Sequence, residues 1–237
     1  MGRLHYFFAV AIVGLAVLAK LSQGVAFEEA KIVKQIPTTH KVVALTIDDG
    51  PHPVMTEELL KVLKEKKIKA TFFILGKNAK LYPELLEKIK KDGHEIGSHA
   101  YTHQYLNKML EKECTEELDQ TEQVLDKTVG QVCLFRPPGG LYNDIVLAEA
   151  KKRGYTTILW SVDPQDWQRP SVEHVVSTVV KEVKPGSIVL LHDGQAHLPT
   201  PQAIAQIVDY FQQKGYTFVT VSELLQYEEV KETMRID

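Results

Sequence analysis

The feature of this 237-residue sequence that most constrains its fold is a repeated helix-stop signal. KDG at residues 91–93, KRG at 152–154 and QKG at 213–215 each end a helical pattern, and each is followed by a strand-like run. A basic last turn suits the negative end of a helix, and Gly adopts the left-handed cap conformation without strain. The sequence therefore predicts a repeating helix-to-strand unit.

Seven strand-like runs alternate with helical patterns along the chain. We expect strands at residues 41–48, 70–76, 94–98, 132–136, 156–163, 187–193 and 216–221. We expect helices at residues 55–67, 81–91, 115–129, 143–153, 171–184 and 201–214, and a short one starting at Ser222. This alternation is typical of a parallel sheet covered by helices. An open doubly wound sheet and a barrel of seven or eight strands both satisfy it.

The first 26 residues have the pattern of a targeting segment. Arg3 precedes an apolar run at residues 7–19, and GVA at 24–26 supplies the small residues that a signal peptidase recognises. We expect a signal peptide cleaved after Ala26, with an uncleaved membrane anchor as the alternative. Both place the protein outside the cell, secreted, associated with the cell wall or anchored to the membrane.

The rest of the chain reads as one domain. We expect a lead-in segment at residues 27–40, the domain at 41–227 and a polar tail at 228–237. Cys114 and Cys133 can pair in an oxidising compartment or remain two buried thiols. Lys and Arg total 28 against 31 for Asp and Glu, a net charge of −3 that argues against a nucleic-acid partner.

Chemically active side chains stand where the predicted strands end. These residues are Asp48, Asp49, His99, His103, Arg136, Asp163, His192 and Asp193. The carboxyl ends of parallel strands share one rim, which is where active sites of such folds gather. Chance would scatter such residues along strands and helices. Their position at strand ends therefore favours an enzyme.

A divalent metal site is one expectation at this rim. His99 and His103 have HxxxH spacing, which on a helix puts both rings on one face. Asp48 and Asp49 can both turn inward if the chain bends at Gly50. Two His and one carboxylate leave coordination positions open for water, although a turn Asp and core histidines explain the same residues.

A second set suggests proton transfer. His192 ends a buried strand and is a candidate general acid, and Asp163 on a neighbouring strand could raise its pKa. Arg136 can hold a carboxylate in one orientation, or make a surface ion pair. His94 is expected to be structural, and Asp166 and Asp193 to support the groups that react.

Five motifs in this order resemble the polysaccharide deacetylases, carbohydrate esterase family 4, also called the NodB-homology domain. They are TIDDGP at 46–51, HAYTH at 99–103, RPPGG at 136–140, DPQDW at 163–167 and LLH at 190–192. The resemblance covers about residues 42–225. It implies a distorted or incomplete (β/α) barrel of about seven parallel strands, a fold that suits a domain shorter than the usual barrel of roughly 250 residues.

The resemblance also implies roles for the catalytic residues. Asp49, His99 and His103 would hold a divalent metal, usually Zn²⁺, with Co²⁺ or Mn²⁺ as other occupants. Asp48 would be the general base that activates water and Arg136 would orient it. His192 would protonate the departing amine, with its pKa adjusted by Asp163.

The substrate side is implied in the same way. A backbone N–H near Gly139 would stabilise the oxyanion, and Leu190 and Trp167 would line the acetyl pocket. Many members carry Tyr where this chain has Gly139, and Tyr142 could replace the missing aromatic wall.

The implied activity is N-deacetylation of an N-acetylglucosamine-containing polysaccharide, peptidoglycan or a chitin-type glycan, by a monomer. O-deacetylation of acetylated xylan, a non-catalytic glycan-binding module and a structural protein are the alternatives.

Overall fold

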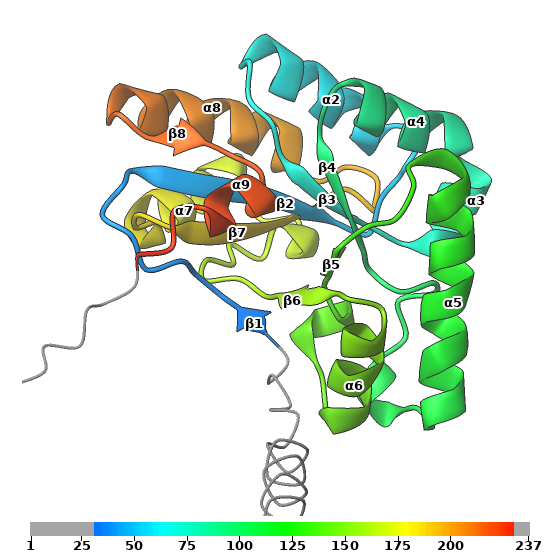
Figure 1. Cartoon of the computed structure of the whole chain (residues 1–237). Coiled ribbons are helices and arrows are strands. Elements are labelled where there is room, and N and C mark those ends of the chain that lie inside the picture. The colour runs from blue at the N-terminus through cyan, green and yellow to red at the C-terminus, as the bar shows by residue number, and fades with distance from the viewer. Residues whose placement is uncertain (1–30, 230–237) are drawn as a thin grey trace, which may run out of the picture.

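A curved parallel sheet of eight strands forms the centre of the protein, shown in a computed structural model that describes residues 31–229 (Figure 1). The strands are β1 (Ile32–Val33), β2 (Val42–Asp48), β3 (Thr71–Ile74), β4 (Glu95–Ser98), β5 (Leu134–Phe135), β6 (Thr156–Ile158), β7 (Ser187–His192) and β8 (Thr217–Phe218). The helices are α2 (Met55–Glu65), α3 (Gly76–Leu81), α4 (Pro83–Lys91), α5 (Glu111–Thr128), α6 (Asp144–Lys152), α7 (Val172–Glu182), α8 (Thr200–Gln213) and α9 (Val221–Leu225).

The strands follow the order β1-β6-β5-β4-β3-β2-β7, and β8 pairs with the first residues of β2. The predicted strand 156–163 is divided among three partners. Its first residues form β6, which pairs with β5 and β1, whereas Val162 forms a parallel bridge to Val189 of β7. In the described part, the segment after β6 forms this isolated bridge with β7 but no continuous strand ladder, so the sheet is a distorted, incomplete barrel, as expected.

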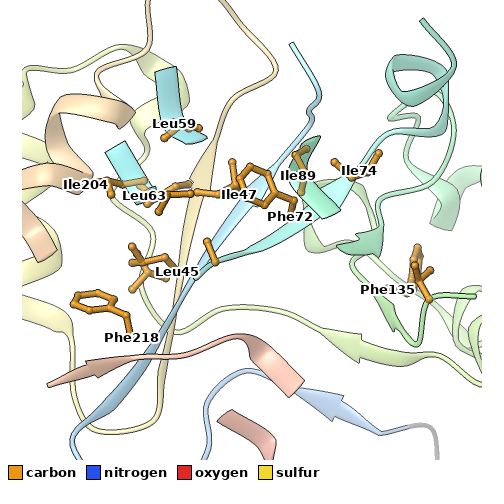
Figure 2. Packing of buried hydrophobic residues seen from close by; sticks show 14 of the residues in the cluster. Leu45, Ile47, Leu59, Leu63, Phe72, Ile74, Ile89, Phe135, Ile204 and Phe218 are labelled. Carbon is orange, nitrogen blue, oxygen red and sulfur yellow. The ribbon is translucent and has the colours of Figure 1, made fainter. Parts of the chain in front are cut away.

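Strand alternation sorts the side chains of β2 into two cores. Val43, Leu45 and Ile47 face the helices, in the main cluster shown in Figure 2. Val42 and Ala44 face the inside of the sheet, in a second cluster. Because side chains alternate along a strand, Asp48 also points inward at the end of this second row.

The helix ends largely follow the predicted signals. Gly93, Gly154 and Gly215 all have positive φ, and Ser171 caps α7 by accepting a hydrogen bond from the His174 N–H at 3.2 Å. The start of α5 was placed wrongly at Thr115. The helix begins at Glu111, because Glu113 accepts the N–H of Leu110 (2.9 Å).

Helix α3 was not predicted. Gly76, expected to end a strand, instead begins this helix, and the previous residue, Leu75, remains extended. The helix matters for the site because its first N–H groups reach the loop after β4.

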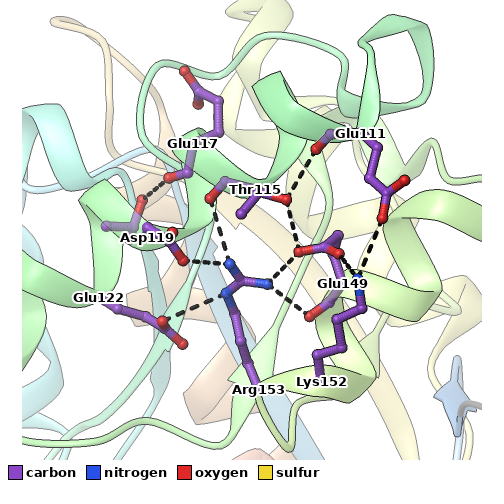
Figure 3. Close-up of polar contacts among 9 residues, drawn as sticks. Glu111, Thr115, Glu117, Asp119, Glu122, Glu149, Lys152 and Arg153 are labelled. Carbon is purple, nitrogen blue, oxygen red and sulfur yellow. Dashed lines mark hydrogen bonds and ion pairs between the residues drawn. The ribbon is translucent and has the colours of Figure 1, made fainter.

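Helices α5 and α6 are joined by a network of charged side chains (Figure 3). Arg153, just after α6, binds Glu149 of α6 (2.7 Å) and contacts Asp119 and Glu122 of α5. Glu149, only 2% exposed, also accepts hydrogen bonds from Lys152 and from Thr115 of α5 (2.9 Å). The network fixes the spacing of the two helices.

The segments expected on either side of the domain take part in its structure. Strand β1 falls within the expected lead-in 27–40, and Glu229 of the expected tail accepts the Thr39 N–H (2.9 Å). The signal peptide or anchor at 1–26 lies outside the described residues. Within residues 31–229, no helix has both the length and the apolar character needed to span a membrane. Cys114 and Cys133 are free thiols, one buried and one exposed.

Candidate active site

A cavity of about 330 Å³ opens at the carboxyl ends of the strands. Its lining includes every predicted site residue except Arg136 and Tyr142. The lining residues are Asp48, Asp49, His99, His103, Tyr105, Gly139, Trp160, Asp163, Trp167, Leu190, His192 and Gln195. The fold therefore brings together side chains that are up to 147 positions apart in the sequence, from Asp48 to Gln195.

Asp48 and Asp49 both face this cavity, but for different reasons. Asp48 ends β2 on its inward face and lies opposite His192 of β7 in the strand register. Asp49 has a φ of 77°, which turns its side chain inward at the predicted bend. Asn78 of α3 donates a hydrogen bond to the Asp49 carbonyl (2.7 Å) and holds this conformation.

Arg136 is fully buried and orients Asp48, so the surface ion pair is wrong. Its guanidinium donates to Asp48 Oδ1 and to Thr46 Oγ1, both at 2.7 Å, and to the carbonyls of Ile158 and Leu159. Burial raises the pKa of Asp48, and the charge of Arg136 opposes this shift. Since Oδ1 is occupied, Asp48 Oδ2 is the oxygen left for the cavity.

Asp49, His99 and His103 form a group that could hold a metal ion, with their ligand atoms within 4.8 Å of one another. Asp49 Oδ1 lies 3.5 Å from His99 Nε2 and 3.4 Å from His103 Nε2. This Oδ1 is buried without a hydrogen-bond partner, a costly state that a cation would relieve.

The protonation of His99 also fits a metal ligand. Its Nδ1 lies 2.7 Å from the Arg136 carbonyl, which can only accept, so Nδ1 carries the hydrogen and Nε2 presents a lone pair to Asp49. Burial lowers the pKa of His99 to about 3, which keeps the ring neutral.

The two histidines do not lie on a helix, the case in which their spacing puts both rings on one face. His99 directly follows β4, and residues 99–103 form an irregular loop. Ala100 and His103 have φ values of 63° and 69°. The HxxxH spacing meets here through a loop conformation, not through helical periodicity.

His192 is paired with Asp166. Its Nδ1 lies 2.8 Å from Asp166 Oδ1, and its backbone N–H donates to Asp166 Oδ2 at 2.9 Å. Burial lowers the pKa of His192, but the hydrogen bond and charge of Asp166 outweigh it and raise this pKa to about 9. The ring is therefore protonated at neutral pH, as a general acid requires.

This pairing corrects the role expected of Asp163. Asp163 Oδ1 accepts the N–H of Gln165 (2.9 Å), two residues further along. Gln165 and Arg169 have positive φ, and the tight turn between them brings Asp166 beneath His192. Asp163 stays at the cavity wall, and the carboxylate that binds His192 is Asp166, three residues later in the same motif.

The aromatic wall beside Gly139 is not built by Tyr142, which packs against the main core. A Cβ added at Gly139 would lie 2.9 Å from the ring of Tyr105, and one at Gly140 would lie 2.7 Å from Trp160. These two rings cover the glycine turn, and Trp167, 43% exposed, stands at the rim. The aromatic rings beside the glycine turn thus come from two other loops.

Trp160 and Tyr105 were missed for different reasons. Trp160 lies two residues after the inward-facing Ile158, so strand alternation could have identified it. Tyr105 follows an irregular loop, where no periodic pattern exists. His94 is structural as expected, since its Nδ1 accepts the N–H of Ala70 (3.2 Å).

Comparisons with known proteins give one consistent result. Residues 35–158 match the family model described as polysaccharide deacetylase. A peptidoglycan-N-acetylglucosamine deacetylase of Bacillus cereus is 43% identical over 196 residues, which cover 81% of this chain and 92% of that protein.

Solved structures agree with this match. The Bc1960 peptidoglycan N-acetylglucosamine deacetylase, in complex with 4-naphthalen-1-yl-N-oxidanyl-benzamide, superposes with a TM-score of 0.80 at 33% identity, over 86% of this chain and 96% of that one. A pseudoenzyme of carbohydrate esterase family 4 from Bacillus anthracis has a TM-score of 0.79 at 28% identity, over 85% of this chain and 71% of that one.

Proposed function

Because this chain belongs to the polysaccharide deacetylase family, carbohydrate esterase family 4, we propose that it is a metal-dependent hydrolase that releases acetate from N-acetylglucosamine-containing polysaccharide. The observation that carries the proposal is the unpartnered Asp49 Oδ1 near His99 and His103, next to Asp48, which lies opposite His192. A base, an acid and three ligand atoms thus meet in one cavity.

Asp49, His99 and His103 would hold the metal, with Zn²⁺ as the first candidate and Co²⁺ or Mn²⁺ as others. Two imidazoles and one carboxylate are a donor set that zinc accepts, and they leave coordination positions open. When bound, the ion would act as a Lewis acid on the acetamide carbonyl.

Asp48 is proposed as the general base. Its Oδ2, not used by Arg136, would take a proton from the attacking water. The raised pKa of Asp48 makes this oxygen a better proton acceptor than an ordinary aspartate. Arg136 keeps the carboxylate from rotating.

His192 is proposed as the general acid. The water oxygen joins the carbonyl carbon, the amide C–N bond breaks, and the sugar amine leaves with a proton from His192. Asp166 keeps this ring charged until that step. A backbone N–H near Gly139 would stabilise the oxyanion.

The cavity wall suggests a sugar polymer as the substrate. Tyr105, Trp160 and Trp167 offer aromatic faces at an open rim, and Leu190 would contact the acetyl methyl group. The similarity to peptidoglycan deacetylases makes peptidoglycan the first candidate and a chitin-type glycan the second. We propose that the protein is a monomer directed out of the cell by residues 1–26, where it is secreted, associated with the cell wall or anchored to the membrane.

The test is acetate release from peptidoglycan, chitooligosaccharide and acetylated xylan, with and without a chelator. We expect release from the first or second substrate, its loss with chelator and its return with Zn²⁺. Release that chelator leaves unchanged would overturn the metal-dependent proposal.

The same panel separates the alternatives. Acetate from xylan, with none from glucosamine polymers, would assign O-deacetylation. Glycan binding without acetate release in zinc-supplemented buffer would identify a non-catalytic module. Against that module stand Asp48, Asp49, His99 and His103, which are all present and correctly grouped.

A further inference from the structure

The loop that carries His103 has an unusual backbone conformation. Ala100 and His103 both lie in the left-handed region, which residues with a Cβ adopt only where the surroundings hold them. The position of the His103 ring, 3.4 Å from Asp49 Oδ1, depends on that conformation. The groups that hold the loop therefore bear on the metal site.

One side of the loop is fixed by helix α3. The N–H groups of Gly76 and Lys77, in the first turn of α3, donate to the carbonyls of Ala100 and Tyr101, both at 3.0 Å. These bonds use helix donors that have no partner within the helix.

The other side is fixed by Glu117 of α5. Its Oε2 accepts the backbone N–H groups of Tyr101 and Thr102, both at 2.9 Å, and its Oε1 accepts the Thr102 hydroxyl at 2.7 Å. Glu117 is 8% exposed, and Figure 3 shows its carboxylate turned away from Arg153. The side chain serves the loop and not the neighbouring charged network.

We propose that Glu117 is a positioning residue for the metal ligand His103, acting through the two backbone amides that precede it. Without this carboxylate, two partly buried N–H groups lose their acceptor and the chain before His103 is free to turn. His99 is held separately, by its own hydrogen bond to the Arg136 carbonyl. Loss of Glu117 therefore displaces one ligand of three.

The inference rests on the metal site proposed above, and the test is Zn²⁺ titration of the metal-free full chain. Glu117→Ala is expected to weaken zinc binding by about 10–100-fold, the usual effect of removing a group that orients a ligand. Glu117→Gln keeps an oxygen for both N–H groups and an amide N–H₂ for the Thr102 hydroxyl, so zinc affinity stays close to that of the unaltered chain. This variant separates hydrogen bonding from charge.

A matched control is Glu113→Ala, one turn earlier on the same helix. Glu113 also accepts a backbone N–H, that of Leu110 (2.9 Å), but does not touch the loop. The zinc affinity of the Glu113→Ala variant should equal that of the unaltered chain. Thermal unfolding without metal shows at which temperatures each variant is folded.

Thr102→Val supplies a milder test if Glu117→Ala does not fold, because it removes only the hydroxyl bond to Glu117. A smaller loss of zinc affinity is expected. Unaltered affinity in Glu117→Ala and Thr102→Val would overturn the inference, as would a Glu117→Gln variant as weak as Glu117→Ala. Failure of the unaltered chain to bind Zn²⁺ would instead overturn the metal site itself.

Discussion

Arg136 at the cavity and Arg153 between α5 and α6 each bind a buried carboxylate, Asp48 and Glu149, but the two clusters leave different atoms available. Around Arg153, the Glu149 carboxylate is used by Arg153, Lys152 and Thr115 (Figure 3). Around Arg136, only Oδ1 of Asp48 is used, and its Oδ2 remains for the cavity.

The pKa values of the two carboxyl groups shift in opposite directions. Burial raises the pKa of both Glu149 and Asp48. The hydrogen bonds to Glu149 outweigh burial and lower its pKa to about 2, whereas those to Asp48 do not. A carboxylate whose two oxygens both accept hydrogen bonds holds helices together, and one with an oxygen left over can accept a proton.

Asp48→Asn tests the cluster around Arg136, where one carboxylate oxygen is left for the cavity, and should have the largest effect. Without a basic oxygen, kcat for acetate release from peptidoglycan should fall by about 10²–10⁴-fold. The matched control is Glu149→Gln in the cluster around Arg153, which should leave kcat unchanged. Full activity in Asp48→Asn would contradict the claim that Asp48, unlike Glu149, accepts a proton during the reaction.

Glu149→Ala tests the cluster around Arg153. Removing this carboxylate leaves Arg153, largely buried, with only Asp119 and Glu122 as counter-charges, and the free energy of unfolding should fall by about 1–3 kcal/mol. Urea unfolding measures this loss, and kcat of the folded protein should not change. A loss of kcat without a loss of stability would contradict a structural role.

The acid dependence of stability sharpens the same prediction. The pKa of Glu149 in the folded chain, about 2, is below the ordinary 4.5, so its contribution is present above pH 4.5 and is lost as the pH falls towards 2. Glu149→Gln should lower the unfolding temperature less at pH 3 than at pH 6. Equal losses at both pH values would count against this assignment.

Asp166→Asn tests the acid side of the cavity. The pKa of His192 should fall from about 9 to the ordinary 6.5 or below, so that about a tenth or less of the ring is protonated at pH 7.5. The basic limb of the activity profile should therefore move to lower pH. Asp163→Asn is the matched control, and a larger shift in that variant would restore the role first expected of Asp163.

Tyr105→Ala should have the smallest effect. Loss of one aromatic wall, worth about 1 kcal/mol, should raise KM roughly fivefold with kcat little changed. Tyr210→Ala removes a similarly exposed ring from α8, outside the cavity, and should change neither constant. An equal rise in KM for both variants would remove Tyr105 from the substrate wall.

Periodic signals explain why much of this could be predicted. The alternation of β2 and β7 places Asp48 and His192 on inward faces, and both conclusions need only the local sequence. Most of the unpredicted features lie in irregular chain or at helix ends. They include the start of α3, the loop from His99 to His103 and the turn that brings Asp166 to His192.

The sequence by itself determined which strand ends carry the catalytic groups, where the helices stop and the family to which the chain belongs. These features depend on residue type and spacing. Only the tertiary structure decided that Asp166 and not Asp163 binds His192, that Tyr105 covers Gly139 and that Glu117 holds the His103 loop. Each of these contacts depends on left-handed backbone turns or on the packing of elements far apart in the chain, and neither leaves a periodic pattern in the sequence.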